Sequence, residues 1–100
     1  SKVGNLATAI QLAKEKGFSF AGAVVKDGAD LIETRFPFPL GLVVGSEQKG
    51  IRDVVRRHLD LEITIPMNID TLSLNVAQAT TIICYEIVRQ KLSHHKVKDS

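Results

Sequence analysis

The residues best placed to do chemistry lie between Leu42 and Asn75, a stretch that reads LVVGSEQKGIRDVVRRHLDLEITIPMNIDTLSLN. One apolar run in it ends in Gly-Ser-Glu, a second ends in Ile-Pro-Met, and Ser-Leu-Asn precedes a long helical pattern. In α/β folds, ligands bind where strands end and helices begin. The stretch therefore predicts a binding site built largely from backbone.

Taken one by one, most of these residues also have a purely structural interpretation. Gly45 is the exception, because a glycine there allows backbone to approach a ligand closely. Glu47 suits the first turn of a helix, and Ser73 or Asn75 suits a helix cap. Residue types alone favour these structural roles, and they equally favour core positions for Ile65 and Leu74 and a solvated helix face for Lys49, Arg52 and Arg56.

The elements that must position these residues follow from the apolar patterning. Helical spacing predicts helices over 6–16, capped by Asn5 and stopped by Gly17, over 48–59 and over 74–92. Apolar runs predict buried strands over 18–25, 40–44 and 63–65. Segment 29–34 is either a short helix or an irregular crossover. The Phe-Pro-Phe-Pro run at 36–39 predicts a stiff connector whose phenylalanines cover the core.

This order of elements predicts an α/β fold with a parallel sheet and flanking helices. Three strands make a thin sheet with an open edge, and the chain begins in a helix without an initiator methionine. We therefore expect that a first half with more strands is missing, and that this piece self-associates through exposed edges.

Composition limits the possible classes of protein. The 100 residues suffice for one small domain, and 44% hydrophobic with 24% charged residues predicts a folded chain. The net charge of +2 does not by itself demand a nucleic-acid partner. The single Cys84 excludes an internal disulfide, and its apolar helical surroundings predict a buried, inert thiol. We expect no metal site, signal peptide or membrane span, and a cytoplasmic location.

Two motifs at matching spacing resemble those of one family. Residues 42–51, LVVGSEQKGI, resemble the second motif of the SpoU (TrmH-like) family of SPOUT methyltransferases, and ITIPM at 63–67 followed by LSLNVA at 72–77 resembles its third. The resemblance covers nearly the whole chain. It identifies residues 1–92 as the C-terminal part of the catalytic domain, with residues 93–100 as a flexible polar tail.

The resemblance implies an S-adenosylmethionine-dependent RNA 2′-O-ribose methyltransferase that acts on ribosomal or transfer RNA. It further implies a C-terminal trefoil knot that holds the cofactor, and a homodimer. Catalytic roles fall to Glu47, as a supporting group rather than the base, and to Ser73 and Asn75. The implied cofactor-binding residues are Val44, Gly45, Ile65, Met67 and Leu74, and RNA contacts are assigned to Lys49, Arg52 and Arg56.

The sequence also departs from the family pattern. The first motif, which carries an Asn and an essential Arg, is absent, and no residue of this chain replaces that Arg. Gln48 stands where Gly is common, and Ala77 where Ser is frequent. We therefore expect this chain alone to be inactive. Two alternatives stay open: a non-catalytic module that binds cofactor or RNA, and a self-associating structural fragment.

Overall fold

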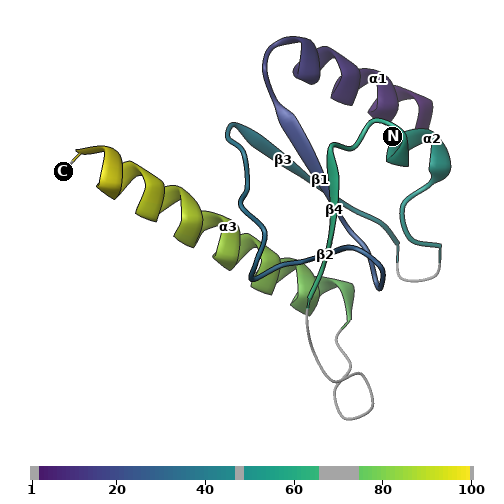
Figure 1. The fold of residues 1–100 in the computed structure, drawn as a ribbon. Helices are drawn as coiled ribbons and strands as arrows, with labels where there is room; N and C mark the ends of the chain where they lie inside the picture. The colour runs from purple at the N-terminus through teal and green to yellow at the C-terminus, as the bar shows by residue number, and fades with distance from the viewer. Residues whose placement is uncertain (1–2, 47–48, 66–74, 100) are drawn as a thin grey trace.

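The computed structural model describes residues 3–46, 49–65 and 75–99. Within these residues, four parallel strands form one sheet in the order β2-β4-β1-β3, with three helices around it (Figure 1). The elements are α1 (Val3–Glu15), β1 (Ser19–Ala23), β2 (Ala29–Asp30), β3 (Leu40–Val44), α2 (Asp53–Arg56), β4 (Leu61–Thr64) and α3 (Val76–Asp99). The α/β class with a parallel sheet, predicted from the sequence, is confirmed.

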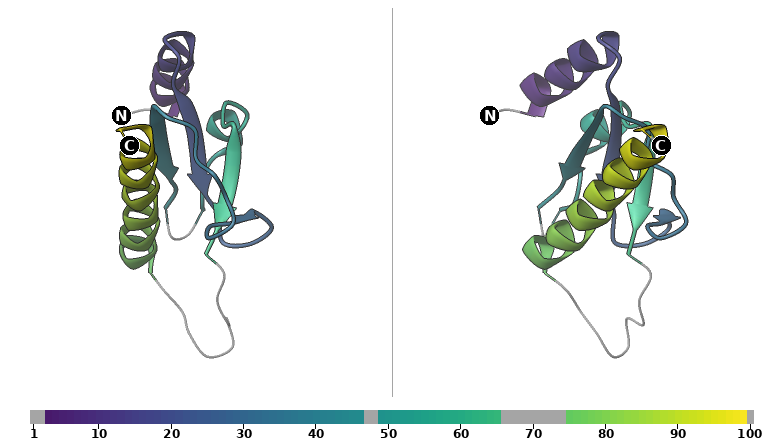
Figure 2. Two further views of the ribbon diagram at one scale, coloured as in Figure 1. Left: turned by 60° about the vertical axis from the view of Figure 1, so that its left-hand side comes forward. Right: turned by 90° about the vertical axis from the view of Figure 1, so that its left-hand side faces the viewer.

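The helices cover the two faces of the sheet unequally. Helices α1 and α2 lie together on one face, whereas α3 crosses the other face alone (Figures 1 and 2). Successive strand residues point to opposite faces, so β3 sends Val43 toward α1 and α2, and Leu42 toward α3. Because a single helix covers its face, the outer side of α3 has no second layer of the described chain above it.

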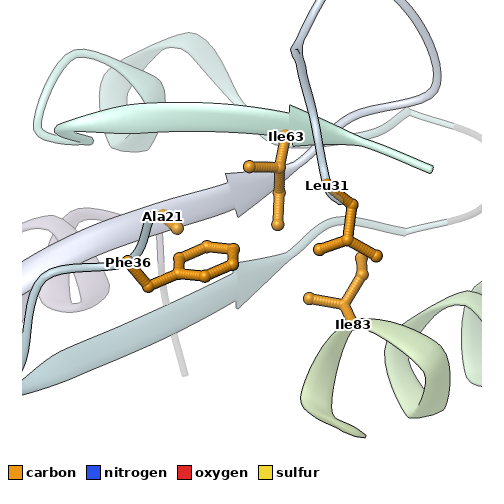
Figure 3. Close-up of a cluster of buried hydrophobic side chains, with 5 residues drawn as sticks. All are labelled: Ala21, Leu31, Phe36, Ile63 and Ile83. Carbon is orange, nitrogen blue, oxygen red and sulfur yellow. The ribbon is translucent and has the colours of Figure 1, made fainter. Parts of the chain in front are cut away.

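Two apolar clusters hold these layers together. Under α3, the sheet side contributes Ala21 of β1, Ile63 of β4 and Leu31, which follows β2. The connector contributes Phe36 and the helix contributes Ile83 (Figure 3). Under α1 and α2, the buried residues are Ile10, Val43 and Val55, with Ile51 and Val54 packed against them. Phe36 thus covers the core, as the connector pattern predicted, and Phe38 packs beside it.

Three strands were expected, and that prediction is wrong because a fourth, β2, lies at the sheet edge. Ala29 and Asp30 pair with Ile63 and Thr64 of β4. Two residues are too short to show the alternation that marks a strand in sequence. The next residue, Leu31, is buried in the core, so the strand is fixed by packing rather than by local pattern.

The helix predicted over 48–59 is much shorter in the structure. Among its described residues, 49–59, only Asp53–Arg56 is α-helical, because Gly50 has a φ of +66° and bridges back to Ser46. A left-handed residue cannot continue a right-handed helix. The apolar residues expected on its inner face nevertheless contact the core as predicted.

The other helix boundaries differ by a few residues. Helix α1 begins at Val3, so Asn5 lies inside it instead of capping it, whereas Gly17 follows its end with a φ of +101°, as the stop signal predicted. Helix α3 continues to Asp99, because 93–99 contains no Gly or Pro to end it. Cys84 is exposed on α3, and the predicted buried thiol is wrong. The division of the chain at residue 92 stays a prediction.

Candidate functional site

A cavity of about 550 Å³ opens at the carboxyl ends of β1, β3 and β4. Its walls are the segments that follow these strands, and the first two turns of α3 close one side. The lining residues are Ala23, Val24, Val25, Lys26, Asp27, Val44, Gly45, Ser46, Lys49, Gly50, Ile51, Arg56, Ile65, Asn75, Val76, Ala79, Thr80 and Ile83. This is the edge of a parallel sheet where ligands are usually bound.

The loop after β3 is closed tightly on itself. The Gly50 amide donates to the Ser46 carbonyl at 2.9 Å, and the Lys49 amide donates to the Ser46 hydroxyl at 3.0 Å. A Cβ at residue 45 would overlap the Gly50 carbonyl and the Ile51 nitrogen. Gly45 is therefore required by the close approach of two backbone segments at the cavity wall.

The turn after β1 is pinned to β4 by one hydroxyl. Thr64 Oγ1 accepts from the Gly28 amide at 2.9 Å and donates to the Val24 carbonyl at 3.3 Å. A Cβ at residue 28 would come within 2.7 Å of that hydroxyl. Asp27, with a φ of 69°, takes the left-handed conformation that the tight turn demands. Lys26 and Asp27 are thereby held beside the cavity.

Asn75 caps α3 and lines the cavity at the same time. Its Oδ1 accepts from the Gln78 amide at 2.8 Å, and Gln78 Oε1 accepts from the Asn75 amide at 3.1 Å. This reciprocal arrangement is a capping box. The capping role that residue type alone favoured is therefore observed. Because Asn75 also lines the cavity, the same residue is placed where it could contact a ligand.

The two apolar residues predicted to hold a cofactor lie at neighbouring strand ends. Val44 is the last residue of β3 and is 37% exposed, and Ile65 follows β4 while packing against the core under α3. Both line the cavity. Ile65 therefore contributes to the core and to the cavity wall, so its structural and functional interpretations are compatible.

The three cations assigned to RNA do not share one helix face, because that helix is too short to include them all. Lys49 lies in the loop after β3, Arg52 precedes α2, and only Arg56 is helical. Lys49 and Arg56 line the cavity, whereas Arg52 is exposed outside its lining. The prediction that the three share one outer helix face is wrong, because two of them lie before the helix begins.

Arg56 is already engaged by an acid. Its Nε and Nη2 donate to the two carboxylate oxygens of Glu62 at 2.5 and 2.8 Å. These hydrogen bonds, with the attraction between the charges, raise the pKa of Arg56 and lower the pKa of Glu62. A ligand phosphate would have to compete with this bidentate pair, which makes Arg56 a weaker candidate for RNA than Lys49.

Four predicted site residues lie outside the described part of the chain: Glu47, Met67, Ser73 and Leu74. Their neighbours in sequence, Ser46, Ile65 and Asn75, all line the cavity. The described residues of the two motifs, which are separate in sequence, therefore meet at one place in the fold, as the strand ends and helix start had predicted.

Sequence reasoning missed the third wall of the cavity. Lys26 and Asp27 were not among the predicted site residues, and Thr80 was included only as part of the helix predicted over 74–92. The available signal was positional: β1 and β3 pair in parallel with Ala23 opposite Val44, so whatever follows β1 must face whatever follows β3.

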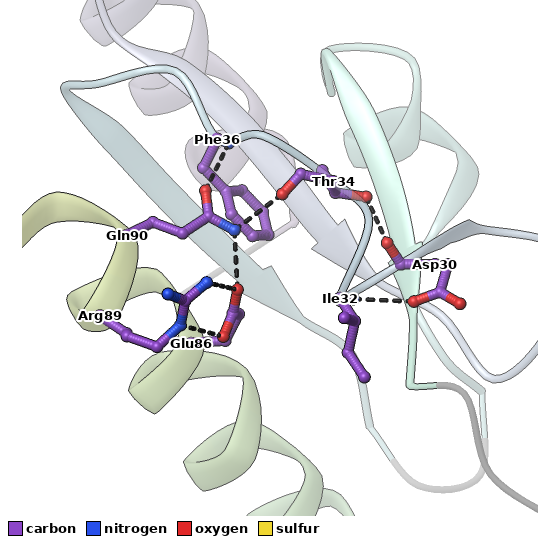
Figure 4. Close-up of polar contacts among 7 residues, drawn as sticks. All are labelled: Asp30, Ile32, Thr34, Phe36, Glu86, Arg89 and Gln90. Carbon is purple, nitrogen blue, oxygen red and sulfur yellow. Dashed lines mark hydrogen bonds and ion pairs between the residues drawn. The ribbon is translucent and has the colours of Figure 1, made fainter. Parts of the chain in front are cut away.

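A second polar cluster joins the connector to the middle of α3, away from the cavity. Gln90 accepts from the Phe36 amide at 2.9 Å and donates to the Thr34 carbonyl at 2.7 Å (Figure 4). Glu86 accepts from Arg89 and Gln90, and these hydrogen bonds lower its pKa to about 2. The cluster ties α3 to the connector and borders a separate cavity of about 690 Å³.

This second cavity is the larger one, but its position argues against a catalytic role. It is lined by connector residues 32–38 and by Arg89, Gln90 and Ser93 of α3, so no strand end opens into it. The cavity at the strand ends gathers residues from both sequence motifs. We therefore take the smaller cavity as the candidate site.

Two negative findings concern the described residues alone. Across 3–46, 49–65 and 75–99, no group of three or more His, Cys, Asp or Glu side chains is arranged to hold a metal ion. In the same part of the chain, no helix combines the length and the apolar character that a membrane crossing requires.

Comparison with known proteins places this geometry in a family. Residues 1–85 match the family described as SpoU rRNA Methylase. The chain is 39% identical over 90 residues to a 23S rRNA (guanosine-2′-O-)-methyltransferase RlmB of Blochmanniella floridana, covering 90% of this chain and 35% of that protein. The RlmB of Yersinia pestis is 36% identical over 90 residues, covering 90% of this chain and 37% of that one.

A solved structure shares the arrangement of elements. The SpoU methyltransferase AviRb from Streptomyces viridochromogenes, in complex with the cofactor AdoMet, superimposes with a TM-score of 0.77 and 30% identity. The match covers 92% of this chain and 36% of that one. The chain thus spans little more than a third of the length of these relatives.

Proposed function

The chain belongs to the SpoU rRNA Methylase family, and from this premise we propose that the intact protein transfers a methyl group from S-adenosylmethionine to a ribose 2′-hydroxyl of RNA. The observation that carries the proposal is the cavity at the ends of β1, β3 and β4, where both family-like motifs meet. Because the chain spans about a third of its relatives' length, the activity is assigned to the intact protein.

The cavity fits a nucleoside cofactor in size and lining. Its volume of about 550 Å³ lies within the usual range of small-molecule sites, roughly 300–1,000 Å³. Backbone approaches without a side chain at Gly45, and apolar walls come from Val44, Ile65 and Ala79. Strand-end main-chain groups can recognise an adenine edge, and the apolar residues can cover its faces.

The residues proposed to hold the cofactor are Val44, Gly45 and Ile65, together with Met67 and Leu74. When bound, S-adenosylmethionine supplies the electrophilic methyl group. The contribution of the loops is to hold both reactants in one orientation, which removes much of the entropic barrier to the reaction. Tight closure of the loop by the Ser46–Gly50 hydrogen bond serves this purpose, because a loose wall would lose the alignment.

Asn75 is proposed to orient the acceptor ribose. Its Oδ1 is engaged by the Gln78 amide, so the Nδ2 group is what this side chain presents to a ligand. An amide cannot remove the hydroxyl proton, but it can donate a hydrogen bond that fixes the sugar. We assign Glu47 and Ser73 supporting roles beside it, with Glu47 orienting a basic group or the substrate.

Removal of the hydroxyl proton requires a base, and we assign that role to none of Asn75, Ser73 and Glu47. The family resemblance places an essential Arg in a first motif outside this sequence. The chain alone is therefore proposed to be inactive, and a proton acceptor is expected elsewhere in the intact protein.

A homodimer is proposed through the outer face of α3. Four large apolar side chains recur there at helical spacing: Ile82 is 41% exposed, Tyr85 71%, Val88 52% and Leu92 64%. The opposite face of the same helix is buried against the sheet through Ile83. A helix that is apolar on both faces is typical of a buried one, and a second copy offers the same stripe in return, as a two-fold interface requires.

The trefoil knot and the cytoplasmic location are also proposed. A knotted chain is an exception to the ordinary rules of topology, and the support for it here is the family resemblance. The segment 66–74, which leads from β4 toward α3, lies outside the described residues. A ribosomal or transfer RNA substrate would be met in the cytoplasm.

The proposed function is tested by methyl transfer in the intact protein. Purified protein is incubated with methyl-labelled S-adenosylmethionine and with unmodified ribosomal or transfer RNA, and the RNA is hydrolysed with alkali. A 2′-O-methyl group blocks cleavage of the next phosphodiester, so label is expected in alkali-resistant dinucleotides. Label in mononucleotides would indicate base methylation and reject the proposal. Cofactor binding without any transfer would favour the non-catalytic binding module.

A further inference from the structure

The turn after β1 is the part of the cavity wall that neither family-like motif includes. It runs from Lys26 to Gly28 and is held by the Thr64 hydroxyl, which contacts both the Gly28 amide and the Val24 carbonyl. Asp27 adopts a left-handed conformation in it. A non-glycine residue in this conformation persists where surrounding structure fixes it, and such positions are frequent at ligand sites.

Lys26 and Lys49 lie on neighbouring walls of this cavity. Ala23 pairs with Val44 in the sheet, so the turn after β1 and the loop after β3 leave the same edge side by side. Both lysines line the cavity and both are exposed. In the described part of the chain, neither ammonium group takes part in any of the three ion pairs that the structure contains.

Among the charged groups at the cavity, Lys26 and Lys49 are the cations available to bind an anionic ligand. Arg56 is occupied by Glu62 through two hydrogen bonds. Asp27 is the one acid among the described lining residues, which include the ammonium groups of Lys26 and Lys49. The described residues that line the cavity therefore carry a net positive charge, with exposed ammonium groups on two walls.

We infer that Lys26 and Lys49 together bind a backbone phosphate of the RNA substrate at the mouth of the cavity, and that Thr64 acts as the positioning residue for Lys26. The inference rests on the proposed function, because a phosphate beside the target ribose is needed only if RNA enters this cavity. Lysine ammonium groups bind phosphate as point charges, and two of them on separate walls fix the strand without reading its sequence.

The test is the salt dependence of RNA binding by the intact protein. The probe is a fluorescein-labelled 20-nucleotide single-stranded RNA, measured by anisotropy with S-adenosylhomocysteine present. Each phosphate contact contributes about 0.7 to the slope of log K against log salt for single strands. The double variant loses the shared phosphate contact and should reduce the magnitude of the slope by about 0.7, and Lys26→Gln and Lys49→Gln should each reduce it by no more than that amount.

A matched control comes from the opposite end of the sheet. Lys16 is an exposed lysine between α1 and β1, so Lys16→Gln removes the same charge far from the cavity and should leave the slope unchanged. A Lys26→Gln slope equal to that of Lys16→Gln would overturn the inference. If Lys16→Gln, Lys26→Gln and Lys49→Gln all reduce the magnitude of the slope equally, RNA is attracted generally to the protein surface, and the inference is overturned as well.

Thr64 is tested with a conservative pair. Thr64→Val loses the hydroxyl that holds the turn and should reduce the magnitude of the slope as Lys26→Gln does. Thr64→Ser keeps a hydroxyl and should give the slope of the unmodified protein. A merely structural role would weaken folding without moving the salt slope. Titration with S-adenosylhomocysteine separates the two proposals: retained cofactor binding with unchanged slopes refutes only the phosphate contact, and absent cofactor binding refutes the proposed function.

Discussion

Replacement of Gly45 by alanine is the perturbation whose effect the structure predicts most sharply. The new Cβ would overlap the carbonyl group of Gly50 and the nitrogen of Ile51. These are backbone atoms, so no side-chain rotation can relieve the overlap. The segment must move away by about 1 Å, because well-packed protein yields to an added methyl only by shifting.

The magnitude follows from what this shift disturbs. Overpacking of this kind typically costs about 1–3 kcal/mol of unfolding free energy. The displaced segment is itself the cavity wall, so the contacts proposed for the cofactor are lost along with the packing. We expect affinity for S-adenosylhomocysteine to fall at least about tenfold, which corresponds to about 1.4 kcal/mol.

A second glycine separates the binding effect from the general loss of stability. Gly17 has a φ of +101° and open space around its Cβ position, and it lies after α1, away from the cavity. Gly17→Ala therefore pays the strain of a left-handed alanine, roughly 1–2 kcal/mol, without touching the cofactor wall. Its cofactor affinity should equal that of the unmodified protein.

The assay is isothermal titration of the intact protein with S-adenosylhomocysteine, with urea unfolding of each variant in parallel. The reasoning predicts weak binding by Gly45→Ala and normal binding by Gly17→Ala, with both variants destabilised. If Gly45→Ala binds the ligand as tightly as the unmodified protein, the segment after β3 does not form the cofactor wall and the site assignment is refuted.

Three further predictions concern the cap, an ion pair and the dimer. Asn75→Ala should cost about 1 kcal/mol of unfolding free energy and Asn75→Ser little, whereas both should lower methyl transfer per folded molecule; normal turnover in the serine variant would limit Asn75 to capping. Hydrogen bonds from Arg89 and Gln90 lower the pKa of Glu86 to about 2, against an ordinary value of 4.5. They stabilise the fold above pH 4.5, and this stabilisation is lost as the pH falls toward 2. The urea midpoint should therefore drop less in Glu86→Gln than in the unmodified protein between about pH 6 and about pH 3, and parallel profiles would contradict the linkage. Tyr85→Glu should convert the intact protein from dimer to monomer by light scattering while the exposed α1 change Gln11→Glu does not; a monomeric unmodified protein would refute the proposed interface.

Much of the fold was predictable because its signals are local. The strand at 40–44 was predicted to the residue, since an apolar run bounded by proline and glycine has few other interpretations. The stop after α1 was predictable from Gly17, because few residues other than glycine take a left-handed conformation cheaply. Both features are encoded within a few residues of themselves.

The features that were mispredicted depend on contacts across the fold. The strand β2 exists because Ala29 and Asp30 meet β4, and no two-residue pattern announces such pairing. The short helix α2 follows from the Ser46–Gly50 bridge, which interrupts an otherwise helical apolar spacing. Cys84 is exposed because one helix alone covers its face of the sheet. Each error concerns what lies opposite a residue, not the residue itself.

The candidate site was predicted in part for the same reason. Strand ends and a helix start could be read from the sequence, and the family resemblance then assigned site roles to Val44, Gly45, Ile65 and Asn75, all of which line one cavity. The turn at Lys26 was missed because its importance comes from the parallel pairing of β1 with β3. That pairing is a property of the sheet order, which the sequence pattern did not specify.

The central claim is that the cavity at the ends of β1, β3 and β4 holds the methyl donor. The most direct measurement is a crystal structure of the intact protein grown with S-adenosylhomocysteine. The account predicts ligand density against Gly45 and Ile65, with the adenine between these two strand ends. Density instead in the cavity between the connector and α3, beside Phe36 and Gln90, would contradict it.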